Sequence, residues 1–81
     1  MKLESGKTVQ LIPLNTTQKV ECFDIQGDME RMYKWAMYGL GLARLSDFDK
    51  SENTYTTADI GEIAAAVVEA TEKGSDPTTK G

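Results

Sequence analysis

The chain has 81 residues, with thirteen Asp and Glu against nine Lys and Arg, no His and a single Cys. This length allows one domain with one small core, which we place in residues 1–74. Without His and with only one Cys, the chain cannot assemble a Cys/His zinc site or a Ser–His or Cys–His catalytic pair. We therefore expect no enzymatic activity, no metal, no other cofactor and no small-molecule substrate.

The distribution of charged and apolar residues argues against two further classes of partner, nucleic acids and membranes. No two Lys or Arg are adjacent, and because nucleic-acid binding depends on clustered cations, no nucleic-acid partner is expected. The sequence has neither an apolar run of roughly 20 residues nor, in its first residues, the apolar stretch of a signal peptide. We expect a cytoplasmic protein without membrane contact, in which Cys22 is a small core residue rather than a nucleophile.

The first thirteen residues predict a β-hairpin. Residues 1–4 and 7–12 flank Ser5-Gly6, a two-residue loop that suits a tight turn. Val9 and Leu11 alternate with polar neighbours and would share one side of the second strand. Pro13 lacks a backbone N–H donor, so the strand should end there.

Three helices are predicted next, over about 15–26, 28–45 and 57–73, followed by a mobile polar tail, 75–81. The expected fold class is α+β, mainly helical: an N-terminal β-hairpin followed by three α-helices. The first helix opens with the capping-box pattern Asn15-Thr16-Thr17-Gln18. Its apolar residues Val20 and Phe23, three apart, would face inward. The third helix opens at Thr56-Thr57-Ala58-Asp59, and the spacing of Ile60, Ile63, Ala64 and Val67 gives it one inward face.

The middle helix carries apolar residues on two opposite sides, at about 100° per residue. One side holds Met29, Met32, Tyr33, Ala36, Leu40 and Ala43, and the other holds Trp35, Tyr38, Leu42 and Leu45. A helix that is apolar on both sides must be buried on both sides, and so short a chain has little material to do this. We predict that Trp35, Tyr38, Leu42 and Leu45 bind a partner, with packing inside the domain as the alternative. Trp and Tyr are enriched at binding hot spots.

Two other patterns have weaker functional interpretations. Residues 47–58 offer oxygen ligands in the order of a calcium loop, but Glu52 stands where a Gly is needed and Ala58 where a bidentate Glu is needed. A solvated polar connection is the better interpretation. Gly39-Leu40-Gly41 lacks the other residues of a phosphate-binding loop, so close helix packing or a helix break explains these glycines better.

The order of elements resembles the small tail assembly chaperones of long-tailed bacteriophages, over residues 9–74. The resemblance rests on three segments: Val9-Gln10-Leu11-Ile12-Pro13-Leu14-Asn15, the Met32–Leu45 helix, and Thr57-Ala58-Asp59-Ile60-Gly61-Glu62-Ile63-Ala64. It implies a non-catalytic protein of the host cytoplasm that self-associates and coats the tape measure protein before the tail tube polymerises.

Two alternatives from other classes stay open. One is a small phage inhibitor of a host enzyme or defence complex, in which acidic side chains would mimic nucleic acid. Such a mimic needs dense acid on one face, whereas the thirteen acids here are spread along the chain. The other is a minor structural component of the virion, such as a connector, which would remain in purified particles.

Overall fold

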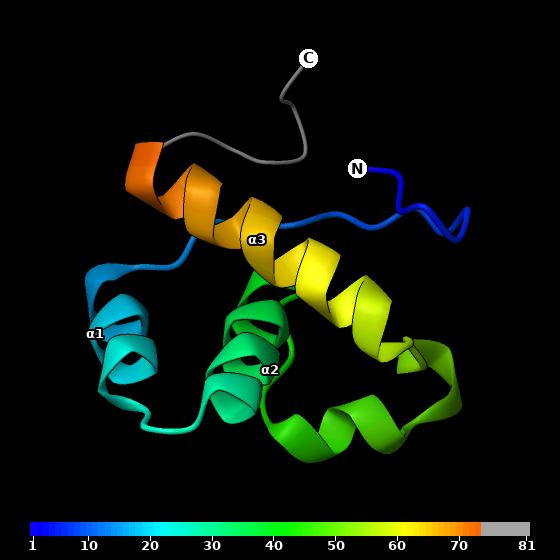
Figure 1. Cartoon of the computed structure of the whole chain (residues 1–81). Helices are drawn as coiled ribbons and strands as arrows, with labels where there is room; N and C mark the ends of the chain where they lie inside the picture. The colour runs from blue at the N-terminus through cyan, green and yellow to red at the C-terminus, as the bar shows by residue number, and fades with distance from the viewer. Residues whose placement is uncertain (74–81) are drawn as a thin grey trace.

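An extended N-terminal segment and three α-helices make up the structure, a computed structural model that describes residues 1–73. The helices are α1 (Thr16–Asp24), α2 (Asp28–Gly39) and α3 (Thr57–Lys73), and two 3₁₀ helices, η1 (Leu45–Asp49) and η2 (Ser51–Asn53), connect α2 to α3. α3 packs across α2, and α1 lies beside α2 at one edge of the molecule (Figure 1). The predicted polar tail, 75–81, lies outside the described residues.

The predicted N-terminal β-hairpin is wrong, because residues 1–73 contain no β-strand. The chain does turn back at Gly6, whose φ is +97°, but within the described residues Lys2 and Thr8 form only an isolated antiparallel bridge. The pairing is limited to this bridge and its flanking hydrogen bonds, which join Met1 to Val9 in both directions at 2.9 Å and the Leu3 amide to the Lys7 carbonyl at 2.8 Å. The chain then leaves this pairing, since the Ile12 amide donates to the Gly39 carbonyl of α2 at 2.8 Å.

Instead of forming a sheet, the N-terminal segment runs along α3. The Glu4 amide donates to the Glu62 carboxylate at 3.3 Å, and the Leu14 amide donates to the Thr71 hydroxyl at 3.0 Å. The segment therefore contributes a row of side chains to the core. Its buried residues are Leu3, Val9, Leu11 and Leu14.

α3 begins and ends as its sequence pattern predicts, at residues 57 and 73. Its capping box is complete: the Asp59 amide donates to the Thr56 hydroxyl at 3.1 Å, and the Thr56 amide donates to the Asp59 carboxylate at 3.2 Å. The predicted inward residues Ile60, Ile63, Ala64 and Val67 are all buried. This helix packs on α2, and the two supply much of the core.

α2 ends at Gly39, well before the predicted end at residue 45. Gly41 has a φ of +78°, and its amide donates to the Tyr38 carbonyl at 3.1 Å. The Leu42 amide donates to the Met37 carbonyl at 3.0 Å. These two bonds and the left-handed glycine form a Schellman motif, which stops the helix. The helix break, one of the two explanations offered for Gly39-Leu40-Gly41, is therefore located at Gly41.

Candidate protein-binding surface

The structure does not place the four predicted partner-binding residues on one helix face. Trp35 is in the core, with 2% of its surface exposed, and Tyr38 is half-buried on the next turn of α2. Leu42 lies in the connection between α2 and η1, and Leu45 is the first residue of η1. Both residues are half-buried. The apolar stripe that motivated the prediction requires a helix to residue 45, and that helix does not exist.

Trp35 is covered by α1. The ring of Phe23 packs edge-on against the indole, with ring centroids 5.6 Å apart and an interplanar angle of 76°. Such T-shaped pairs are a favoured aromatic geometry. Phe23 nevertheless keeps 55% of its surface exposed, so its ring shields Trp35 on one side and faces solvent on the other.

The prediction that Val20 and Phe23 face inward is wrong. Val20 is 61% exposed and Phe23 is 55% exposed, whereas Cys22 is completely buried. The half-buried or buried side of this segment holds Gln18, Lys19, Cys22 and Ile25. Gln18, Cys22 and Ile25 have the i, i+4, i+7 spacing of one helix face, and Lys19 precedes Cys22 by three residues. The inward face of this segment therefore includes two polar residues, while the two large apolar side chains of α1 point outward.

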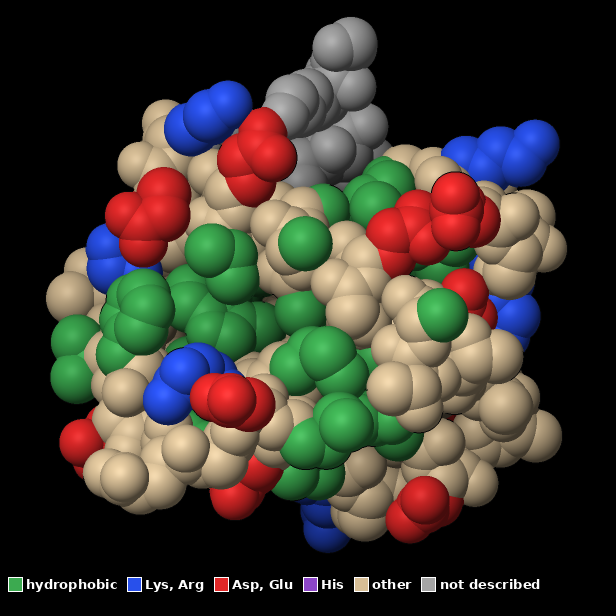
Figure 2. Space-filling view, viewed as in Figure 1, with side chains coloured by type: hydrophobic (Ala, Val, Ile, Leu, Met, Phe, Trp, Pro, Cys, Tyr) green, Lys and Arg blue, Asp and Glu red, His purple; other side chains and the backbone are tan. Residues whose placement is uncertain are grey.

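We call Val20 and Phe23 the α1 surface. Figure 2 shows hydrophobic side chains gathered on the side of the molecule where α1 lies, with charged side chains beside them. Met29 is also exposed, at 58%, but its position on the helix is on the opposite side of α2 from Lys34 and Tyr38, which contact α1. Met29 is therefore not part of the α1 surface.

Polar contacts fix the orientation of α1. The Tyr38 hydroxyl donates to the Glu21 carboxylate, and Lys34 forms an ion pair with Glu21 at 3.9 Å. The hydrogen bond to Glu21, helped by desolvation and by the nearby negative charge, raises the pKa of Tyr38 to about 12. At the end of α1, the Arg31 guanidinium donates to the Ile25 carbonyl at 2.7 and 3.2 Å.

Cys22 has the environment of a core residue, as the sequence predicted. Burial raises the pKa of its thiol, and the Glu21 carboxylate raises it further, against a smaller opposing effect of Lys34. A nucleophilic cysteine needs a lowered pKa and access to solvent. In this conformation Cys22 has neither, so its thiol serves packing.

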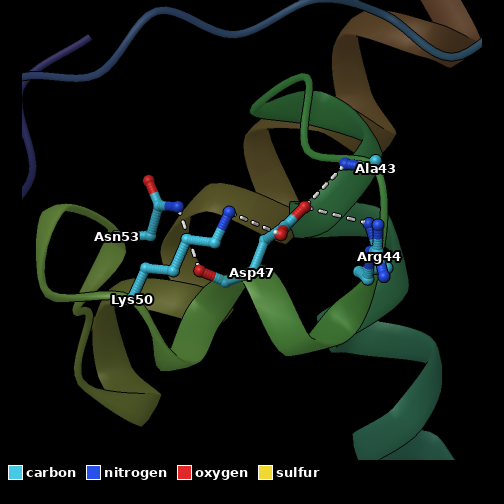
Figure 3. A network of polar contacts seen from close by, with 5 residues as sticks. All are labelled: Ala43, Arg44, Asp47, Lys50 and Asn53. Atoms are coloured by element: carbon cyan, nitrogen blue, oxygen red, sulfur yellow. Dashed lines mark hydrogen bonds and ion pairs between the residues drawn. The ribbon is translucent and has the colours of Figure 1, made fainter.

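Asp47 organises the connection between α2 and α3, the segment with the partial calcium-loop pattern, by accepting hydrogen bonds (Figure 3). Its carboxylate accepts from the amides of Ala43 at 3.0 Å and Arg44 at 3.2 Å and pairs with Lys50 at 3.4 Å, while its carbonyl accepts from the Asn53 side chain at 2.9 Å. Desolvation acts to raise the pKa of Asp47, but these donors together outweigh it and lower the pKa. Within residues 1–73, no cluster of three or more His, Cys, Asp or Glu could hold a metal ion.

Comparison with protein-family models, with curated proteins and with solved structures finds no match for this chain. No helix in residues 1–73 combines the length and the apolar character that crossing a bilayer requires. Sequence reasoning missed the α1 surface because it assigned Val20 and Phe23 to the core from their spacing alone. The spacing of Gln18, Cys22 and Ile25 was the available signal for a different inward face.

Proposed function

We propose that this chain is a non-catalytic protein-binding module whose α1 surface holds an apolar segment of another protein. One observation carries this proposal: the first helix turns Val20 and Phe23 to solvent while it buries Cys22. An amphipathic helix of a globular protein normally buries its large apolar side chains and exposes its polar ones. Val20 and Phe23 lie on one short helix, where an apolar side chain of a partner could pack against both residues.

Covering the α1 surface would add to the affinity for a partner that also makes contacts elsewhere. Fully burying a Val or Phe side chain contributes about 1.5–3 kcal/mol. Because more than half of each side chain is exposed here, covering both would contribute about 2 kcal/mol, roughly a thirtyfold gain in affinity. A contribution of this size is comparable to that of one hot-spot residue within a larger interface.

The resemblance to tail assembly chaperones supports a narrower form of this proposal. In that form, the partner is a tape measure protein, the chain self-associates, and binding takes place in the cytoplasm of a bacterial host. A holding protein of this kind must keep an apolar partner in solution. Exposed apolar side chains on one helix suit that task, and the acidic side chains of α3, Glu62, Glu69 and Glu72, favour solubility.

An aggregation assay tests the proposal. The probe is the insulin B chain, which precipitates when insulin is reduced and whose light scattering can be followed. We expect the wild-type chain to suppress this scattering at near-equal molar ratio. The double variant Val20→Ser/Phe23→Ser should lose most of the suppression, because it removes both side chains of the α1 surface. Val20→Ser alone, which leaves the contact between Phe23 and Trp35 in place, should lose part of the suppression.

The control variant is Ala65→Ser, which changes an exposed small residue on α3 and should suppress scattering as the wild type does. Circular dichroism of the wild type and of each variant checks that every protein is folded. Absence of suppression by the wild-type chain, or equal suppression by the wild type and the double variant, would contradict the proposal.

A further inference from the structure

α1 is attached to the rest of the protein more weakly than the other α-helices. Among the helices of residues 1–73 it packs against α2 alone, whereas α2 and α3 pack against each other extensively. Cys22 is the only one of its residues that is buried. A helix as short as α1 is unstable by itself, because isolated helices below about 12–15 residues are marginal in water.

The other contacts of α1 are ones that water can replace. Glu21 is half exposed, at 48% of its side chain, in its ion pair with Lys34. The hydrogen bond from Tyr38 to Glu21 lies at the surface as well. Breaking such exposed polar contacts has little cost, since exposed ion pairs contribute about 0–1 kcal/mol. Only the burial of Cys22 and the packing of Phe23 on Trp35 resist separation.

The chain on either side of α1 is held in place. Before α1, Leu14 is buried and its amide donates to the Thr71 hydroxyl of α3 at 3.0 Å. After α1, the Ile25 carbonyl accepts from Arg31 of α2. Residues 15–24 therefore lie between two anchors, and they can open without pulling the core apart.

We propose that α1 is a strap that opens locally in the folded protein, uncovering Cys22 and Trp35 while α2 and α3 stay packed. This inference does not rest on the proposed function, because a chain that binds nothing could still open. Its consequence for binding is direct: the open form adds the indole of Trp35, otherwise 2% exposed, to the apolar surface that a partner could contact. Local openings below the global unfolding free energy are a general property of weakly packed elements.

The rate at which the Cys22 thiol reacts with an aromatic disulfide reagent measures this opening. The closed form should not react, because Cys22 is fully buried. If α1 opens by itself, the labelling rate at low urea should depend on urea far less steeply than global unfolding does, since opening exposes little surface. A labelling rate that follows the global unfolding slope at all urea concentrations would overturn the inference.

Two N-cap residues give a matched pair of variants. Asn15 caps α1, and its side chain accepts from the Gln18 amide at 2.9 Å; Thr56 caps α3. Removing either cap weakens only its own helix. We expect Asn15→Ala to accelerate Cys22 labelling about fivefold and Thr56→Ala to change it less than twofold, although Thr56→Ala lowers global stability.

Asn15→Asp, which keeps a capping oxygen, should label at the wild-type rate. Equal acceleration by Asn15→Ala and Thr56→Ala would show that Cys22 is reached only through global unfolding, and would overturn the inference. If Asn15→Ala does not fold, the urea dependence of labelling in the wild-type chain decides the question.

Discussion

At Gly39 the backbone of α2 packs directly against the Val67 side chain of α3. A Cβ atom built at this position would lie 2.3 Å from Cγ2 of Val67, which real atoms do not tolerate. The Gly39 carbonyl also accepts from the Ile12 amide at 2.8 Å. One residue therefore joins the N-terminal segment, α2 and α3, and its lack of a side chain is required.

Replacing Gly39 with Ala should destabilise the protein by about 1 kcal/mol. Overpacking of a core costs about 1–3 kcal/mol, and this outweighs the gain of about 1 kcal/mol that Ala brings to a helix interior. The measurement is the free energy of unfolding in urea. Gly61→Ala is the matched control, because the new Cβ would lie at an ordinary 3.6 Å from Sδ of Met32; it should leave stability unchanged or raise it.

The double variant Gly39→Ala/Val67→Ala identifies the cause. If the clash with Val67 is responsible, the loss in the double variant should be smaller than the sum of the losses in the two single variants. Additive losses would contradict this account of Gly39.

The sequence offered two explanations for its paired glycines, close packing and a helix break, and each glycine meets one of them. Gly39 provides the close packing and Gly41, with its φ of +78°, provides the break. Sequence could not assign them, because the atom that crowds Gly39 belongs to Val67, far along the chain. The same uncertainty extended α2 to residue 45 and created a stripe of four apolar residues that the structure separates.

Among the elements, the helices with the clearest capping boxes and apolar faces in the sequence were predicted best. α3 combines a capping box with a single apolar face, and its range and inward residues follow from the sequence. The capping box of α1 at Asn15 is also present as predicted. Which side of α1 faces inward was not predictable from apolar content, because Cys22, Tyr38 and Arg31 orient the helix through contacts made with α2.

The connection between α2 and α3 depends on the ionised form of Asp47. Its pKa is lowered in the folded protein from an ordinary value of 3.8, so folding favours the carboxylate. A lowered folded pKa contributes stability above the unfolded pKa, and that contribution is lost as the pH falls through the folded value. The protein should therefore lose stability as the pH falls below about 3.8, in part through Asp47.

Asp47→Asn should reduce stability at neutral pH and make the remaining stability less sensitive to acid. The Asn side chain lacks the negative charge that pairs with Lys50, and it has no carboxylate to protonate. Urea unfolding at a series of pH values measures both effects. A variant whose stability falls with acid as steeply as that of the wild type would show that Asp47 makes no such contribution.

At the scale of the whole molecule, the N-terminal segment replaces the sheet that its alternating sequence predicted. Val9 and Leu11 do share a buried side, so the alternation was informative. The prediction that a second strand pairs with this segment was wrong. Val9 and Leu11 pack onto helices, and the Ile12 amide donates to the Gly39 carbonyl of α2 rather than to another strand. Alternation reports which side of an extended segment is buried, and it does not report what covers that side.

This arrangement completes one core from the N-terminal segment, α2 and α3 and leaves α1 at its margin. Cys22 is the one residue of α1 that is buried in this core, whereas Val20 and Phe23 remain outside it, which is the basis of the proposed binding function. The tail-chaperone role remains a prediction that the resemblance supports. Independently of that role, we propose that a partner makes contact with the outward side of α1.

Site-specific photo-crosslinking tests this claim most directly. A photoreactive amino acid replaces Val20 in one protein and Ala65, exposed on α3, in another, and each is irradiated with the reduced insulin B chain. The account predicts a covalent adduct from position 20 and little or none from position 65. Equal yields at the two positions, or an adduct from position 65 alone, would contradict it.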